Sequence, residues 1–431
     1  MTGPRWIDVP APAVELKAVN MPARMAAVDA QFYWMSAKVP NDDFLLYAFA
    51  GVPTGFDSAA DDVRRRAQAC PALTLRVDDG SPLTYPNWVP TAVEPAWVLR
   101  HQLDDSSWPG CLDAVVRLAD DPLDIRRAPW RLHLFAPVHE IPGGTGPGTV
   151  AVMQVSHALA DGTRSALLAA VLFGRATTVP EVVTSSGFLP WRAVNAARAH
   201  RKLVHDTRAG LLRPSVGLRP ALSTNARPAG ARTVRTLVRH RSQLRGPTVT
   251  VAVLAAVSSA LSAHLGDAAT SPIAEVPMAK PGVPQAHNHF FNVTVGLYPD
   301  LDRHARVERI AADLANGRRR AQHPASRAAD QAFAAVPAPL LRWGVSLFDP
   351  AVRPSQVSGN TVVSSVYRGP ADLRFGDAPV LLTAGYPALS PAMGLVHGVH
   401  GIGDTIAISI HAAASAAGDV DDYTARLDAE L

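Results

Sequence analysis

The chain has 431 residues, of which 48% are hydrophobic and 18% are charged. This composition is typical of a soluble globular protein and excludes a largely disordered chain. The net charge of +4 is weak evidence for a nucleic-acid partner and is better suited to a modestly anionic one. The length exceeds that of one ordinary core, so we expect two domains or two packed halves.

The cysteine content and the N-terminus indicate the compartment. Cys70 and Cys111 are the two cysteines and do not form a disulfide framework, which favours a reducing cytoplasm. The opening MTGPRWIDVPAP lacks the basic segment followed by an apolar one that a secretion signal has.

The longest uncharged run, 246–266, contains three Ser, two Thr and one His. We therefore expect a helix buried between two layers of protein rather than a membrane span.

The first half alternates strand-like and helix-like segments. Apolar runs and alternating patterns predict strands at 42–51, 73–80, 130–138 and 149–155. Apolar residues at helical spacing predict helices at 112–120 and 163–176.

A basic stretch rich in Pro and Gly follows and lacks sustained apolar periodicity. From 191 to 245 there are thirteen Lys or Arg and a single acid, Asp206. We interpret 181–235 as a linker between an N-terminal half, 1–180, and a C-terminal half, 236–431. The linker is either a solvated connector or a surface for anionic lipid headgroups or the phosphates of coenzyme A.

The second half again mixes helices and strands. We expect helices at 246–266 and 303–322, strands at 287–300 and 362–367, and a hairpin over 395–412. The mixed order predicts an α/β or α+β fold in two halves.

The stretch SHALADG (156–162) stands between a buried strand and a helix, so His157 lies on a loop. A neutral imidazole accepts and returns protons near physiological pH, and a loop at a strand end gives it access to a substrate. Asp161 has two readings, a helix N-cap or an ion pair with a distant arginine. Gly162 permits a tight backbone path. The alternative is that His157 is an ordinary loop histidine.

Other chemistries have less support. His287, His289, His397 and His400 lack further ligands at metal-binding spacing. No Gly-x-Ser-x-Gly segment indicates a serine hydrolase, and the aromatic residues are too scattered for a nucleic-acid stacking platform.

Several further segments accompany SHALADG in a fixed order. They are MAAVDAQFYWMS (25–36), PLDIRRAPWRLHLF (122–135), GPTVTVAVLAAVSSAL (246–261), Asn288 ahead of an apolar strand, and SSVYRGP (364–370). From about residue 21 to the C-terminus the chain resembles the bacterial wax ester synthase/diacylglycerol acyltransferase family, within the coenzyme-A-dependent acyltransferase superfamily.

The resemblance implies two similar α/β halves, each with a mixed sheet, and a channel between them. It implies that His157 is the catalytic base of the His-His-x-x-x-Asp-Gly motif and that Asp161 shapes its loop, with Ser156 and Gly162 supporting the motif. Asn288, Thr250, Val251 and Trp130 become candidates for the substrate channel. Three positions depart from the family pattern: Ser156 replaces the first histidine, Thr250 and Val251 replace an Asn-Asp pair, and Ser365 replaces an Asn.

The function implied is transfer of an acyl group from acyl-CoA to diacylglycerol or a long-chain alcohol, without metal or cofactor. One alternative keeps this chemistry with another hydroxyl acceptor, such as a glycolipid or polyketide. Another is a degenerate relative that binds lipid without catalysis, as the substitutions at Ser156, Thr250 and Val251 suggest. We expect a cytoplasmic protein, with peripheral contact to the inner membrane or lipid droplets as a further hypothesis, and no nucleic-acid partner.

Overall fold

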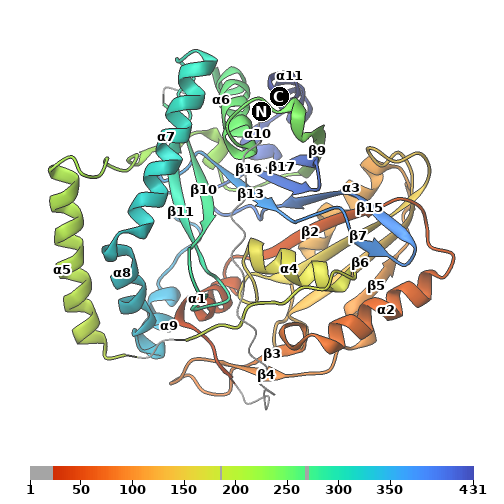
Figure 1. Cartoon of the computed structure of the whole chain (residues 1–431), viewed down its shortest axis with the longest axis horizontal. Helices are drawn as coiled ribbons and strands as arrows, with labels where there is room; N and C mark the ends of the chain where they lie inside the picture. Colours follow the sequence, from red (N-terminus) through yellow and green to blue (C-terminus); the bar gives the residue numbers. More distant parts are fainter. Residues whose placement is uncertain (1–22, 185–186, 267–270) are drawn as a thin grey trace.

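The computed structural model describes residues 23–184, 187–266 and 271–431, which form two lobes built on two mixed sheets (Figure 1). The opening MTGPRWIDVPAP, in which we expect no secretion signal, lies outside the described residues. Each sheet has six strands, and each mixes parallel with antiparallel pairs. The predicted class, a mixed α/β fold with two mixed-sheet halves, is confirmed.

The first sheet runs in the order β14-β15-β2-β7-β6-β5. Its strands are β14 (Arg374–Phe375), β15 (Ala378–Tyr386), β2 (Asp42–Phe49), β7 (Gly148–Ser156), β6 (Trp130–Val138) and β5 (Val98–His101). Only β5 and β6 pair in parallel within this sheet. The strands predicted at 42–51, 130–138 and 149–155 are confirmed as β2, β6 and β7.

The second sheet runs in the order β11-β10-β13-β16-β17-β9. Its strands are β11 (Phe290–Gly296), β10 (Ile273–Ala279), β13 (Thr361–Tyr367), β16 (Leu395–Ile402), β17 (Thr405–Ala413) and β9 (Arg232–His240). The parallel pairs are β10 with β13 and β13 with β16. The predicted hairpin is confirmed as β16 and β17.

Helices surround the two sheets (Figure 1). They are α1 (Ala27–Ser36), α2 (Phe56–Ala69), α3 (Trp108–Arg117), α4 (Gly162–Leu172), α5 (Leu189–Arg208), α6 (Val249–Leu265), α7 (Arg303–Gln322), α8 (Pro324–Ala334), α9 (Ala338–Ser346), α10 (Ala414–Ala417) and α11 (Val420–Glu430). Short strands complete the fold: β1 (Ala23–Arg24), β3 (Leu75–Asp78) and β4 (Asn87–Pro90) form one small sheet, and β8 (Arg219–Pro220) pairs with β12 (Gln356–Val357).

The sequence order and the spatial lobes do not coincide. Strands β14 and β15 come late in the chain but join the first sheet, where β15 pairs with β2. The expected boundary between 235 and 236 falls inside β9, and the expected linker 181–235 contains the 20-residue helix α5. Polar and small residues make up much of α5, and Asp206 is its one buried side chain. The helix therefore has no apolar stripe that would reveal it in the sequence.

The two lobes meet closely where β15 runs beside β16. A Cβ added to Gly398 on β16 would come within 2.2 Å of the backbone oxygen of Gly385 on β15. Only glycine permits this approach, so residues from both sheets hold the lobes in one arrangement.

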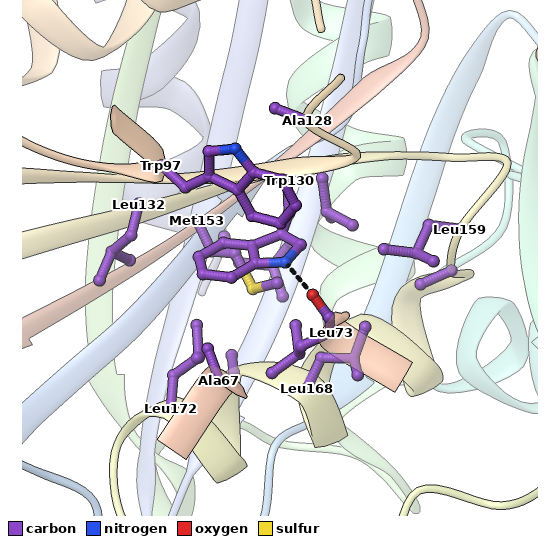
Figure 2. Packing of buried hydrophobic residues seen from close by; sticks show 14 of the residues in the cluster. Ala67, Leu73, Trp97, Ala128, Trp130, Leu132, Met153, Leu159, Leu168 and Leu172 are labelled. Atoms are coloured by element: carbon purple, nitrogen blue, oxygen red, sulfur yellow. Dashed lines mark hydrogen bonds between the residues drawn. The ribbon is translucent and has the colours of Figure 1, made fainter. Parts of the chain in front are cut away.

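Trp130, a candidate for the substrate channel, belongs instead to the core of the first lobe (Figure 2). Its side chain is 0% exposed and packs edge-on against Trp97, with ring centroids 5.3 Å apart. Its indole Nε1 donates a hydrogen bond to the Leu73 carbonyl oxygen at 2.9 Å. A tryptophan that is fully packed and satisfied in this way stabilises the core and presents no surface to a ligand.

The apolar run 246–266 forms α6, whose buried residues lie in the core of the second lobe. This confirms the prediction of a buried helix. Val251, another channel candidate, is 3% exposed and packs in that core. Over the described ranges, none of the helices has both the length and the apolarity needed to cross a bilayer.

Candidate active site

His157 is positioned by the end of β7. Residue Ser156 is the last of that strand and pairs with Asp42 on β2, so the backbone before His157 is fixed by the sheet. A short loop follows, and α4 begins at Gly162. The Ser156 hydroxyl accepts a hydrogen bond from the Ala158 backbone N–H at 3.3 Å, which tightens this loop.

The His157 imidazole is half-buried and contacts the other lobe. Its Nδ1 lies 2.7 Å from Oδ1 of Asn288, the candidate that precedes β11. The ring stacks on Phe32 of α1, with centroids 4.2 Å apart and planes inclined by 2°, and Phe290 lies 5.7 Å away. Sequence segments about 130 residues apart therefore meet on one imidazole.

The hydrogen bonds of Asn288 determine which nitrogen of His157 carries the proton. Asn288 Nδ2 donates to Asp29 Oδ1 at 2.9 Å and to the His157 backbone oxygen at 2.7 Å. Both amide hydrogens are thus engaged, and the oxygen Oδ1 must face the imidazole. A carbonyl oxygen only accepts, so His157 Nδ1 is the donor, and the neutral ring keeps its lone pair on Nε2.

Asp29 on α1 holds Asn288 in place through the hydrogen bond that Asn288 Nδ2 donates. Its carboxylate also accepts hydrogen bonds from the backbone N–H groups of His287 and Asn288, each at 2.9 Å. The side chain is 1% exposed, and burial raises its pKa to about 6, an effect that these hydrogen bonds oppose. Asp29 is a positioning residue, because it reaches His157 only through Asn288.

Asp161 holds the other end of the loop. Its Oδ1 accepts from the Arg164 backbone N–H at 2.9 Å, which confirms the N-cap reading for α4. Its Oδ2 accepts from the His289 backbone N–H at 2.8 Å. The alternative, an ion pair with a distant arginine, is not found among the described residues. Asp161 therefore ties the His157 loop to the Asn288 segment and shapes the site without an exposed charge of its own.

Two further ionisable side chains, Asp43 and Arg368, lie near His157. Asp43 of β2 pairs across the ladder with Val155, two residues before His157. Burial raises the pKa of Asp43, and the positive charge of Arg368 opposes this effect. Arg368 is 4% exposed and donates to the Ala384 oxygen at 2.8 Å, which connects the end of β13 to β15.

The remaining departures from the family pattern contact each other. Thr250 Oγ1 of α6 lies 2.9 Å from Ser365 Oγ of β13, within hydrogen-bond distance. Val366, the next residue on β13, approaches the motif, because a Cβ added to Gly162 would come within 3.2 Å of its Cγ2. Thr250 and Ser365 meet on the face of β13 opposite Val366, whereas Val251 and Trp130 lie in the lobe cores.

The four other histidines considered as metal ligands are dispersed. His397 is buried between Thr361 and Tyr423, and its Nε2 lies 2.7 Å from the Tyr423 hydroxyl. His287 and His289 precede β11 rather than lying on a strand. Over the described ranges, no group of three or more His, Cys, Asp or Glu side chains could hold a metal ion.

Sequence reasoning missed Asp29, Phe32, Asp43 and Arg368. Asp29 and Phe32 lie in the segment 25–36, which carried part of the resemblance, and their spacing on one helix was the available signal. Their contact with Asn288 and His157 depends on long-range packing, which no local pattern encodes.

Comparison with known proteins identifies the fold. No protein-family model and no curated protein sequence matches the chain. Among solved structures, it is similar to a wax ester synthase/diacylglycerol acyltransferase from Marinobacter aquaeolei VT8, with a TM-score of 0.64 and 16% identity over 95% of this chain and 97% of that one. The chain has the two-lobed fold of the coenzyme-A-dependent acyltransferases. This confirms the fold that the resemblance implied.

Condensation domains of peptide synthetases share that fold. The first condensation domain of the calcium-dependent antibiotic (CDA) synthetase matches with a TM-score of 0.59 and 14% identity, over 94% of this chain and 93% of that one. The starter condensation domain of rhizomide synthetase, crystallised with C8-CoA and Leu-SNAC, matches with a TM-score of 0.57 and 14% identity, over 94% and 92%. These identities establish the fold and leave the reaction to be argued from the site.

We predict that replacing Asn288 with Ala removes the preference of the His157 ring for the tautomer with its proton on Nδ1. In the unaltered protein, ¹⁵N NMR of the ring at neutral pH should show protonated Nδ1 and unprotonated Nε2. In Asn288→Ala, both tautomers should be populated, because no acceptor faces Nδ1. Asn292→Ala, on the exposed side of β11, is the control. An unchanged His157 spectrum in Asn288→Ala would contradict the assignment.

We predict that Asp29 makes stability depend on pH. Its pKa is higher in the folded protein, about 6, than the ordinary value of 3.8, so the folded state binds more protons between these values. The stability of the unaltered protein relative to Asp29→Asn should be greatest below pH 4, fall as the pH rises to about 6, and then level off. Urea unfolding from pH 4 to 7.5 should reveal a change of up to about 3 kcal/mol. A difference that is constant or grows with pH would refute this.

Proposed function

We propose that this protein transfers an acyl group from a coenzyme A thioester to a hydroxyl group, with His157 as general base. The observation that carries the proposal is the hydrogen bond from His157 Nδ1 to Asn288 Oδ1, since it leaves the Nε2 lone pair available. A half-buried base held by both lobes is what general-base catalysis requires. The starter condensation domain crystallised with C8-CoA has the same fold, which supports acyl-CoA as the donor.

The reaction needs no covalent enzyme intermediate. Nε2 of His157 takes the proton of the acceptor hydroxyl as the oxygen attacks the thioester carbonyl carbon. The carbon–oxygen bond forms, the carbon–sulfur bond breaks, and the imidazolium returns its proton to the departing thiolate. Holding both substrates at one base makes the transfer effectively intramolecular. Asn288 stays bonded to Nδ1 throughout and stabilises the positive charge on the ring.

For the acceptor we propose diacylglycerol or a long-chain alcohol, giving triacylglycerol or wax ester. Support comes from the similarity to the Marinobacter enzyme, whose name gives these activities, and from the segments that resemble its family. The alternative of another hydroxyl acceptor, such as a glycolipid or polyketide, draws on the departures from the family pattern at Thr250 and Ser365. A lipid-binding relative without catalysis remains the alternative from a different class.

We predict that ester formation depends on His157. The purified protein is incubated with palmitoyl-CoA and a panel of hydroxyl acceptors, and the ester and free coenzyme A are quantified. His157→Ala should lower the rate by roughly 100- to 10,000-fold, because the general base is lost. His304→Ala, an exposed histidine on α7, is the control. Equal rates in His157→Ala would refute the base, and lipid binding without turnover in either protein would favour the carrier.

We also propose peripheral contact with anionic lipid surfaces through the basic α5. Arg198 and Arg201 are exposed on this helix, and Lys202 pairs with Asp206 at 2.8 Å. Neutralising Arg198, Arg201 and Lys202 with Gln should weaken binding to phosphatidylserine vesicles, measured by sedimentation, by about 100-fold, since each cation contributes about 1 kcal/mol near such a surface. The control replaces Arg65, Arg126 and Arg127 of the first lobe. Binding that the α5 triple variant leaves unaltered would remove the proposal.

A further inference from the structure

A pocket of about 250 Å³ lies between the lobes, on the side of β2 away from His157. Asp42 and Phe44 line it, and because neighbouring strand residues point to opposite faces, Asp43 faces the His157 side instead. The wall of the first lobe is completed by α3, and that of the second by Val234 of β9, which packs beside α3 (Figure 1). The volume is slightly below the range of about 300–1,000 Å³ common for ligand pockets, so the occupant is small.

Asp42 supplies an unused hydrogen-bond acceptor at this pocket. The residue is 8% exposed, and its Oδ2 accepts from the Leu123 backbone N–H at 2.9 Å and from Gln154 Nε2 at 2.8 Å. Among the described residues, no hydrogen bond reaches the other oxygen, Oδ1. Oδ1 therefore keeps its acceptor lone pairs free for a hydrogen-bond donor bound in the pocket.

His411 adds a second acceptor to the lining. Its Nδ1 lies 2.9 Å from the Pro387 carbonyl oxygen and therefore donates to it, which leaves Nε2 as an acceptor. Burial lowers the pKa of His411 to about 4, so the ring is neutral at physiological pH. Nε2 has no partner within the described part of the chain.

The other polar groups of the pocket are already engaged. The Arg232 guanidinium pairs with Asp120, and the Tyr386 hydroxyl lies 2.8 Å from Thr236 Oγ1. The remaining lining is largely aliphatic and aromatic, as at Val115 and Phe44. A matching ligand has a short apolar chain and a hydrogen-bond donor, and Arg232 in the wall disfavours a cationic donor such as an ammonium group.

We propose that this pocket binds a short aliphatic alcohol, whose hydroxyl donates to Asp42 Oδ1 and whose chain packs against α3 and β9. The site is separate from the proposed acyl-transfer site, and its occupancy does not require that activity. A bound alcohol would contact the strand residue that pairs with Ser156, immediately before His157. The pocket thus offers a second place for an alcohol, at the joint between the lobes.

The test compares 1-hexanol with 1-methoxypentane, which has the same number of heavy atoms and no donor. Saturation-transfer NMR and calorimetry on the full chain should show 1-hexanol binding about tenfold more tightly, the value of one hydrogen bond to a charged acceptor. In Asp42→Asn, the amide oxygen can keep the bonds to Leu123 and Gln154, which places the amide NH₂ where Oδ1 was. The preference should then shift toward the ether, whereas Asp113→Asn on the outer side of α3 should leave it unchanged.

Two further variants locate the site. Ala119→Phe at the pocket rim should abolish binding of both probes while the melting temperature reports that the protein remains folded. His157→Ala should retain the full preference for 1-hexanol, so the result is independent of the proposed catalysis. The inference is overturned if 1-hexanol does not bind, if it binds no better than the ether, or if Asp42→Asn and a folded Ala119→Phe variant both bind it normally.

Discussion

The hydrogen bond between Asn288 and His157 is the contact through which the two lobes make one site. Asn288 comes from the segment before β11, and His157 comes from the loop after β7. Neither lobe alone defines the tautomer of the imidazole, because the Asn288 side-chain amide that faces His157 is itself oriented by its hydrogen bond to Asp29 on α1. The nitrogen that carries the proton is therefore set by three segments that converge only in the folded chain.

This dependence explains why the lobes must be held rigidly. Strands β14 and β15 cross from the second half of the sequence into the first sheet, and Gly385 and Gly398 let β15 and β16 approach closely. Arg368 is bonded to β15 from the end of β13 at the same joint. A relative shift of the lobes by about 1 Å would break the bond to His157, since hydrogen bonds weaken steeply with distance and angle.

The fold is compatible with several reactions, as its similarity to both an ester-forming enzyme and peptide-synthetase condensation domains illustrates. What they share is the architecture, whereas the choice of nucleophile depends on the polar groups around the motif. In this chain Thr250 and Ser365, both departures from the family pattern, form a contact of their own.

The sequence by itself determined the elements whose signals are local. The alternating pattern of 130–138 and the amphipathic pattern of 303–322 gave the bounds of β6 and α7, and the position of Asp161 before a helix indicated capping as one of two roles. The motif and its companion segments also indicated the fold and nominated His157 and Asn288. These succeed because periodicity, capping and turns depend on neighbours along the chain.

Only the tertiary structure decided which distant residues meet. Trp130 and Val251 belong to motif-like segments, yet packing places them in the cores, because a large apolar side chain gains most by complete burial. Helix α5 lay within the expected linker, since a helix with little buried surface has no apolar stripe to reveal it. Asp29 and Phe32 contact Asn288 and His157, which are more than a hundred residues away in the chain. Long-range packing alone brings these residues together, so no local sequence pattern could place Asp29 and Phe32 at the site.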